Sequence, residues 1–211
     1  KLREADAVVI NIPPPRGNEN PEEFYAIGMR ELEKRISAGN ATHVVFVSST
    51  GVFGAGQHHC DEDTEPQPDR TAGRVLFEAE QLFRSSFRGK FSVIRPGGLV
   101  GSDRFPGRFM AGRTGLSGKK HPVNLVHRDD LIALTRAILE KDFERTVFHA
   151  VAKDHPSKQD FYQKAAAILN LERPEFDPGD ESQGKFISAE KSKTAAGVRF
   201  KYDDPYDMLT A

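Results

Sequence analysis

The sequence predicts an α/β protein whose doubly wound parallel sheet is covered by helices on both faces. Segments of strand length alternate with segments of helical period, and the strand segments are apolar nearly throughout, as strands buried on both faces are. With 211 residues, of which 37% are hydrophobic, the chain can bury one sizeable core and a smaller lobe. The predicted strands span residues 7–12, 43–48, 91–95 and 146–151.

The helix between the first two strands has the clearest predicted boundaries. Asn20 is a suitable N-cap, Glu23 completes the capping pair, and Pro21 fits the first helical position. Gly39 closes the helix. Its predicted buried face consists of Tyr25, Met29, Leu32 and Ile36.

Two further helices are predicted to pack on the sheet, one before the third strand and one before the fourth. In both, the residues of the predicted buried face recur at helical spacing. These residues are Val75, Ala79, Leu82 and Ser86, with Leu76 and Phe83 beside them, and then Leu131, Leu134 and Ile138.

From Lys153 onward the alternation of strands and helices stops. A helix capped by Ser157 and Asp160 follows, and after a Pro/Gly-rich segment a short helix ends near Gly197. The predicted buried stripe of the first of these helices is Phe161, Ala165 and Ile168.

This change of pattern predicts two structural units. Residues 1–101 and 126–151 are expected to form the sheet domain. Residues 102–125 and 152–211 are expected to form a small C-terminal lobe, which a long loop joins to the sheet.

Composition excludes several classes of partner. Lys+Arg number 30 against Asp+Glu 31, and no basic stripe stands out, which argues against nucleic acid or an anionic membrane as the main partner. The single cysteine, Cys60, cannot form an intrachain disulfide, and no segment reads as a secretory signal or a membrane span. We expect a soluble, cytoplasmic protein.

The chain starts at Lys1 and enters a strand at Ala7, so we expect residues to be missing upstream.

Three successive predicted strands end in loops rich in glycine, proline and small hydroxyl residues. They are residues 11–17, residues 48–54 (the serine loop) and residues 95–101 (the glycine loop). Glycine and proline are also ordinary turn residues, so each loop alone could be a turn that binds no ligand. Ligands of open parallel sheets bind outside the carboxyl ends of the strands, and three such loops at one edge favour a flat cofactor held by main-chain groups.

The order of motifs resembles the extended short-chain dehydrogenase/reductase family, also called the NAD-dependent epimerase/dehydratase family. The motifs are VVFVSSTGVFG, the acidic DEDTEPQP, EAE on a helix, VIRPGGLVG and NLVHRDDL. The resemblance runs from about Ala5 to the C-terminus, and NIPPP and GRVLFEAE are most similar to an atypical branch of nucleoside-diphosphate-sugar epimerase-like proteins.

The resemblance implies a Rossmann-like fold that binds NAD or NADP and transfers hydride to or from a carbonyl or nucleotide-sugar substrate. It also implies that Ser49, with Thr50 beside it, holds the reacting oxygen, and it leaves a homodimer possible by analogy. The implied cofactor contacts are Asn11, Ile12, Pro13, Pro14, Ser48, Arg74, Pro96, Gly97, Gly98 and Leu99. The substrate contacts predicted alongside them are Arg104, Arg108, Asn124 and His127.

Two of these substrate predictions have a structural alternative. Arg104 and Arg108 belong to a locally basic loop whose guanidinium groups could hold phosphates, or which could simply be solvated. His127 and Asp130 match an H-x-x-D pattern of the family, for which a purely structural role is equally open.

Two signatures of the family are absent. No tyrosine lies between Ser48 and Arg95, where the family carries a Tyr-x-x-x-Lys pair that serves as acid and base. Aligning Arg74 with the lysine puts Arg70 at the tyrosine position, and aligning on Glu80 puts Ala72 there. The glycine fingerprint G-x-G-x-x-G would precede this chain. The alternative function is therefore a catalytically impaired NAD(P)-binding sensor or interaction module.

Residues 56–63 offer adjacent candidate metal ligands. They include His58, His59, Cys60 and Asp61, but no second Cys/His pair stands at metal-binding spacing. No metal site is predicted, and the segment is expected to form an exposed loop over the mouth of the site.

Overall fold

A computed structural model describes residues 2–15, 20–101 and 103–211 of the chain. Its centre is a four-stranded sheet in the order β1-β2-β4-β7, in which every pair of neighbours is parallel. This confirms the predicted α/β class, and the strands end within two residues of the predicted positions. The strands are β1 (Ala7–Ile10), β2 (His43–Val47), β4 (Lys90–Pro96) and β7 (Thr146–Ala150).

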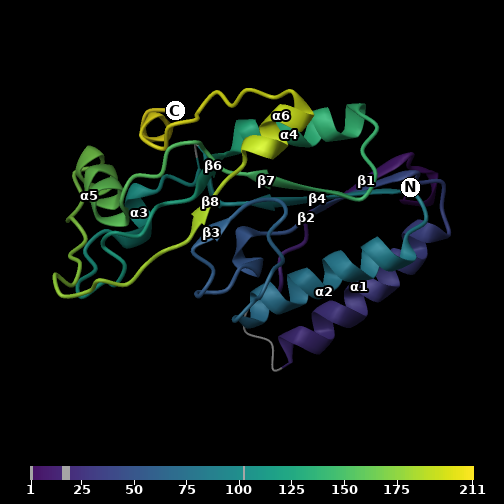
Figure 1. The fold of residues 1–211 in the computed structure, drawn as a ribbon, viewed down its shortest axis with the longest axis horizontal. Coiled ribbons are helices and arrows are strands. Elements are labelled where there is room, and N and C mark those ends of the chain that lie inside the picture. Colours follow the sequence, from purple (N-terminus) through teal and green to yellow (C-terminus); the bar gives the residue numbers. More distant parts are fainter. Residues whose placement is uncertain (1, 16–19, 102) are drawn as a thin grey trace.

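Helices cover both faces of the sheet (Figure 1). α1 (Pro21–Ser37) and α2 (Thr71–Ser86) pack side by side on one face, and α4 (Arg128–Glu140) and α6 (Glu190–Ala196) cover the other. Since side chains alternate along a strand, Phe46 joins the core under α1 and α2, while its neighbour Val45 joins the core under α4.

The start of α1 forms as predicted. The Nδ2 group of Asn20 donates to Oε2 of Glu23 at 2.7 Å, and the Glu23 N–H approaches Oδ1 of Asn20 at 3.5 Å. Pro21 occupies the first helical position, where its missing N–H costs nothing.

Two residues predicted on buried faces are exposed. Ser86 is the last residue of α2, and its hydroxyl donates back to the Leu82 carbonyl at 2.7 Å. Ile168, the last residue of α5 (Lys158–Ile168), is 43% exposed, whereas Phe161 and Ala165 are buried as predicted. Both predictions were wrong because the final residue of a helix can keep the right spacing and still project beyond the surface that the helix packs against.

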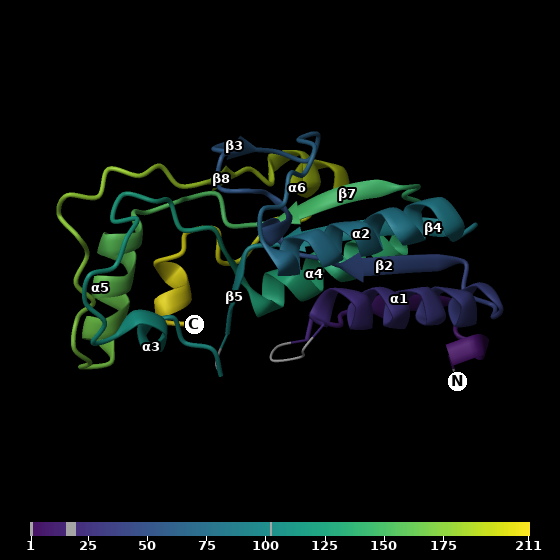
Figure 2. The ribbon, with the colours of Figure 1, turned by 90° about the horizontal axis from the view of Figure 1, so that it is seen from below.

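A third core lies at the end of the molecule away from α1 (Figure 2). There α5 packs against the short helix α3 (Gly107–Met110) and the C-terminal turn η3 (Asp207–Leu209). Its buried members are Val100, Val123, Leu125, Ala152, Phe161, Tyr162, Ala165, Met208 and Leu209.

Two short pairs of parallel strands connect this region with the sheet. β5 (Gly98–Val100) pairs with β6 (Leu125–His127), and β3 (His59–Cys60) pairs with β8 (Phe186–Ile187). Among the described residues, no helix has the length and apolar character needed to cross a membrane.

A buried ion pair joins α2 to the central strand β4. The Arg95 guanidinium donates to both carboxylate oxygens of Glu80, at 3.2 and 2.7 Å, and the two side chains are only 4% and 1% exposed. Arg95 also lies 5.3 Å from the centroid of the Phe53 ring, which connects the pair to the serine loop.

Candidate functional site

The serine loop begins where β2 ends. The Ser48 N–H donates to the Ile94 carbonyl at 2.7 Å, and the buried Ser48 hydroxyl has no hydrogen-bond partner within the described part of the chain. Ser49 caps the turn η2 (Thr50–Val52), because its Oγ accepts the Gly51 N–H at 3.0 Å. Oγ of Ser49 is therefore held in place while its hydrogen stays available for a ligand.

The first turn of α2 packs directly on this loop. A Cβ built on Gly73 would lie under 3.0 Å from the Gly51 carbonyl oxygen, a distance that real Cβ atoms essentially never show. Only glycine lets the two backbones approach so closely. The position of the serine loop is thus coupled to the start of α2.

Gly73→Ala is expected to lower the free energy of unfolding by about 1–3 kcal/mol, because the new methyl group must push α2 and the serine loop apart. Gly28→Ala is the matched control. Gly28 also lies in a helix, but nothing lies within 4 Å of its Cβ position. That change should raise stability by about 0.5–1 kcal/mol through helix propensity. Chemical denaturation measures both changes, and equal effects of the two would contradict the close packing at Gly73.

The glycine loop is held by main-chain contacts on both sides. The Gly97 N–H donates to the Ala150 carbonyl at 3.0 Å, and the Gly98 N–H donates to the Asn124 carbonyl at 2.8 Å. A Cβ on Gly97 would lie under 3.0 Å from that same Asn124 oxygen. At Gly97 and Gly98 the loop therefore has backbone alone, and the Asn124 backbone fills the direction in which a Gly97 side chain would point.

Asn124 links the glycine loop to the C-terminal segment. Its Nδ2 group donates to the Lys185 carbonyl at 2.7 Å, and its Oδ1 accepts the Ile187 N–H at 3.0 Å. The predicted substrate residue Asn124 thus fixes the segment that borders the site.

A pocket of about 240 Å³ opens between the serine loop, the start of α2 and this C-terminal segment. Lys185 lines it, and its ammonium donates to the carbonyl of Phe53, another lining residue. None of the predicted site residues lines this pocket, although it adjoins both Ser49 and Asn124. The lining residues are Gly51, Phe53, Ala55, Asp69, Arg70, His121, Gln183, Gly184 and Lys185.

The loop after β1 lies next to the serine loop, since β1 and β2 are parallel neighbours. The Tyr25 hydroxyl of α1 donates to the Ile12 carbonyl at 2.7 Å, and burial raises the pKa of Tyr25 to about 12. Ile12 and Pro13 line an apolar groove of about 400 Å³ along α1, while Asn11 is exposed. The predicted residues 16 and 17 of this loop, and residue 102 of the long loop, lie outside the described residues.

The position of the family's tyrosine is occupied by other groups in either alignment. Arg70 is the N-cap residue of α2 and lines the pocket, whereas Ala72 lies in the first turn and is exposed. Neither side chain can exchange a proton near neutral pH, because a guanidinium stays charged and a methyl group has no proton to give.

Three arginines predicted at the site lie on the surface, and one of them, Arg104, contacts the glycine loop. Arg74 forms an ion pair with Glu22 of α1 at 2.8 Å. Nε of Arg104 donates to the Leu99 carbonyl at 3.2 Å, and Arg108 is exposed on α3. Their roles toward a ligand stay predictions.

His127 and Asp130 hold the C-terminal segment in place. The Asp130 carboxylate accepts the N–H groups of Lys201 and Tyr202, at 2.7 and 3.0 Å. The ring of His127 lies 4.1 Å from the Tyr202 ring, and its Nδ1 accepts the Asp129 N–H at 3.2 Å. These contacts support the structural alternative for the H-x-x-D pattern.

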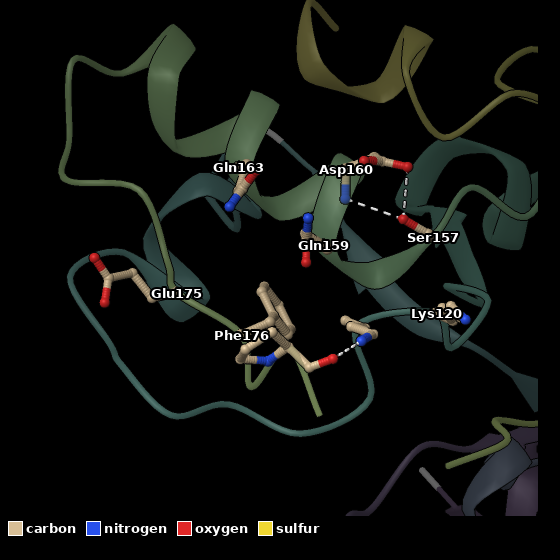
Figure 3. Close-up of a pocket in the computed structure, with 9 residues that line it drawn as sticks. Lys120, Ser157, Gln159, Asp160, Gln163, Glu175 and Phe176 are labelled. Atoms are coloured by element: carbon tan, nitrogen blue, oxygen red, sulfur yellow. Dashed lines mark hydrogen bonds between the residues drawn. The ribbon is translucent and has the colours of Figure 1, made fainter. Parts of the chain in front are cut away.

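A larger cavity of about 750 Å³ lies in the C-terminal part (Figure 3). Gln159 and Gln163 of α5 face the segment that carries Glu175 and Phe176. Lys119 and Lys120, which lie in the same long loop as Arg104 and Arg108, border it and pair with Glu181 at 3.2 and 2.6 Å. None of the predicted site residues lines this cavity.

Residues 56–63, which contain the adjacent histidines, contact residues of the C-terminal part of the chain. Lys191 pairs with Asp61 at 2.7 Å and holds the pKa of that carboxyl at about 2. Cys60 is buried, which raises the pKa of its thiol, and His59 packs 5.7 Å from Phe186. Among the described residues, no three His, Cys, Asp or Glu side chains are placed so that they could hold one metal ion.

A parallel sheet covered by helices on both faces defines a Rossmann-like fold, and comparisons with known proteins agree. UDP-glucuronic acid 4-epimerase from Bacillus cereus, solved with NAD, superimposes with a TM-score of 0.81 at 17% identity, over 100% of this chain and 73% of that one. UDP-N-acetylglucosamine 4-epimerase from the same organism gives 0.79 at 14% identity, over 99% and 76%. No family model matches the chain.

A sequence relative establishes the family. Protein YeeZ from Escherichia coli strain K12 is 35% identical over 208 residues, which are 98% of this chain and 75% of that protein. The chain belongs to the extended short-chain dehydrogenase/reductase family, in an atypical branch.

Lys185 and Gly73 were not predicted from the sequence as residues of the site. Lys185 stands in a loop of glycine, serine and glutamine without periodicity, so no local signal marked it. Gly73 could have been noticed, because a glycine inside a predicted helix often marks a close approach of two backbones.

Proposed function

We propose that the protein binds NAD or NADP at the carboxyl edge of the sheet and transfers hydride to or from the carbonyl carbon of a nucleotide-sugar or related substrate. The convergence of the serine loop and the glycine loop at this edge carries the proposal. Two further observations support it: the family membership, and the NAD that the Bacillus cereus UDP-glucuronic acid 4-epimerase was solved with.

The residues present suit the nicotinamide half of such a cofactor. Gly97 and Gly98 leave backbone without side chains at this edge, where a flat ring could stack. The Ser48 hydroxyl, which has no hydrogen-bond partner among the described residues, is a hydrogen-bonding group at the same edge. When bound, the nicotinamide supplies the hydride donor or acceptor. The fingerprint for the pyrophosphate is not among the 211 residues.

Ser49 is the residue that we propose donates a hydrogen bond to the substrate. Its oxygen already accepts the Gly51 N–H, so its hydroxyl hydrogen can donate to the carbonyl or alcohol oxygen of the substrate. Such a donor stabilises negative charge that develops on that oxygen during hydride transfer.

A second candidate function is a sensor that binds the dinucleotide without turning over a substrate. The arginine or alanine at the tyrosine position favours it, since neither supplies the proton transfer of the ordinary family. Both functions share the cofactor site and differ only in chemistry.

A turnover assay separates the two. The protein, expressed from its complete reading frame, is incubated with NAD and NADP in either redox state and a panel of UDP- and dTDP-sugars and small carbonyl compounds, while the absorbance of the reduced nicotinamide is followed. Epimerisation without net redox change is followed by chromatography of the sugars. Turnover supports the enzyme, whereas cofactor binding without turnover of any compound favours the sensor.

A further inference from the structure

The pocket beside the serine loop holds more positive than negative charge. Among the described residues, Lys185 and Arg70 line it together with one carboxylate, that of Asp69. The Asp69 carboxylate accepts the Ala55 N–H at 2.7 Å. Within the described ranges, neither the Lys185 ammonium nor the Arg70 guanidinium forms an ion pair. Two cations without paired carboxylates in one concave site favour an anionic ligand.

The Lys185 side chain is preorganised. Its ammonium donates to the Phe53 carbonyl, and Asn124 holds the backbone on both sides of it through the Lys185 carbonyl and the Ile187 N–H. A Cβ built on Gly184 would lie only 2.6 Å from the Cβ of His121, so the path of the chain before Lys185 is tightly confined. A ligand that meets a fixed cation loses little affinity to ordering the site.

The charged groups of the pocket act on one another. Burial lowers the pKa of Lys185, Asp69 opposes this shift, and Arg70 adds to it. Cys60, from the neighbouring segment, acts in the same direction as Asp69. An anion placed between Lys185 and Arg70 would relieve their mutual repulsion.

We propose that this pocket is a subsite for one anionic group of the substrate, a carboxylate or a phosphate, bound by the Lys185 ammonium and the Arg70 guanidinium. The inference rests on the proposed function, because Gly51 both lines the pocket and positions Ser49 through its N–H. The substrate is then a carbonyl compound whose anionic group lies close to the reacting oxygen. At about 240 Å³ the pocket is smaller than the roughly 300–1,000 Å³ of sites for drug-sized ligands, which suits one such group rather than a whole nucleotide.

Arg70 also bears on the missing acid/base tyrosine of the family. In one of the two alignments it stands where the ordinary family carries its acid/base tyrosine. The position would then bind the charge of the substrate instead of moving a proton.

Calorimetric titration with inorganic phosphate and, separately, with malonate tests the subsite in the protein expressed from its complete reading frame. Lys185→Met and Arg70→Met are each expected to weaken binding of the preferred anion by about 10- to 100-fold, since each removes a charge-assisted hydrogen bond. Lys185→Arg keeps the charge and should retain most of the affinity. Lys34→Met, which removes an exposed charge on α1, is the matched control and should leave binding unchanged. Circular dichroism checks that each variant is folded.

Phosphate and malonate distinguish the two chemistries, and tighter binding of either identifies the group. The subsite is overturned if neither anion binds saturably, or if Lys185→Met and Arg70→Met bind both anions as the unchanged protein does. Titration of the same samples with NADH and NADPH separates this outcome from failure of the proposed function. Cofactor binding without anion binding removes the subsite alone, and anion binding that depends on Lys185 without cofactor binding removes the cofactor proposal alone.

Discussion

Glu80→Ala is expected to lower the free energy of unfolding by about 3–5 kcal/mol, the cost of leaving one partner of a buried ion pair uncompensated. The Arg95 side chain is only 4% exposed, so water cannot replace the two hydrogen bonds that Glu80 accepts. Arg95 lies in the central strand β4 and against the Phe53 ring, so the disturbance should reach the serine loop. Chemical denaturation monitored by circular dichroism measures the loss.

Glu78→Ala is the control for this change. Glu78 lies two residues away on the same helix and is exposed, so its removal should alter stability by less than about 0.5 kcal/mol. The double variant Glu80→Leu with Arg95→Met removes both charges and should recover much of the loss. A Glu80→Ala protein as stable as the Glu78→Ala protein would show that the pair is not buried as described.

Ser49→Ala is expected to reduce kcat/KM by about 100- to 1,000-fold with any substrate that the protein turns over, the usual effect of losing a donor to a developing oxyanion. The hydroxyl is the only hydrogen-bond donor of this side chain, and its oxygen is already fixed by the Gly51 N–H. Binding of NADH or NADPH should change little, since the proposed role is toward the substrate. Steady-state kinetics and cofactor titration measure the two quantities separately.

Ser49→Thr keeps the hydroxyl and should preserve much of the activity, which separates the loss of the donor from a disturbed turn. Ser85→Ala is the matched control, because the Ser85 hydroxyl donates to the Gln81 and Leu82 carbonyls of its own helix and is exposed. Turnover by Ser49→Ala equal to that of Ser85→Ala would remove Ser49 from the mechanism.

The features predicted correctly from the sequence have local causes. Asn20, Pro21 and Glu23 lie within four residues and define the start of α1 by their own hydrogen-bonding and backbone preferences. The strands followed from continuous apolar segments, and their parallel order from the helices between them. The convergence of the loops then followed from the rule that parallel strands place their carboxyl ends at one edge.

The features that were missed depend on contacts between distant residues. Asn124 and Lys185 are 61 residues apart, and Asp130 and Lys201 are 71 apart. No periodicity or capping pattern in the sequence predicts such pairs. The pocket that Lys185 lines could therefore not be predicted from the sequence. The exposure of Ser86 and Ile168 likewise depends on where each packed surface ends, which helical spacing does not encode.

The central claim is that the serine loop and the glycine loop form the nicotinamide side of an NAD or NADP site. Fluorescence titration of the protein, expressed from its complete reading frame, with NADH and NADPH tests it most directly. We expect saturable binding of at least one of them. Gly97→Ala should weaken it about tenfold or more, because the methyl group would displace the glycine loop from Asn124, while Ser85→Ala, an exposed change on α2, should leave it unchanged. Binding of neither nucleotide, or equal binding by both variants, would contradict the claim.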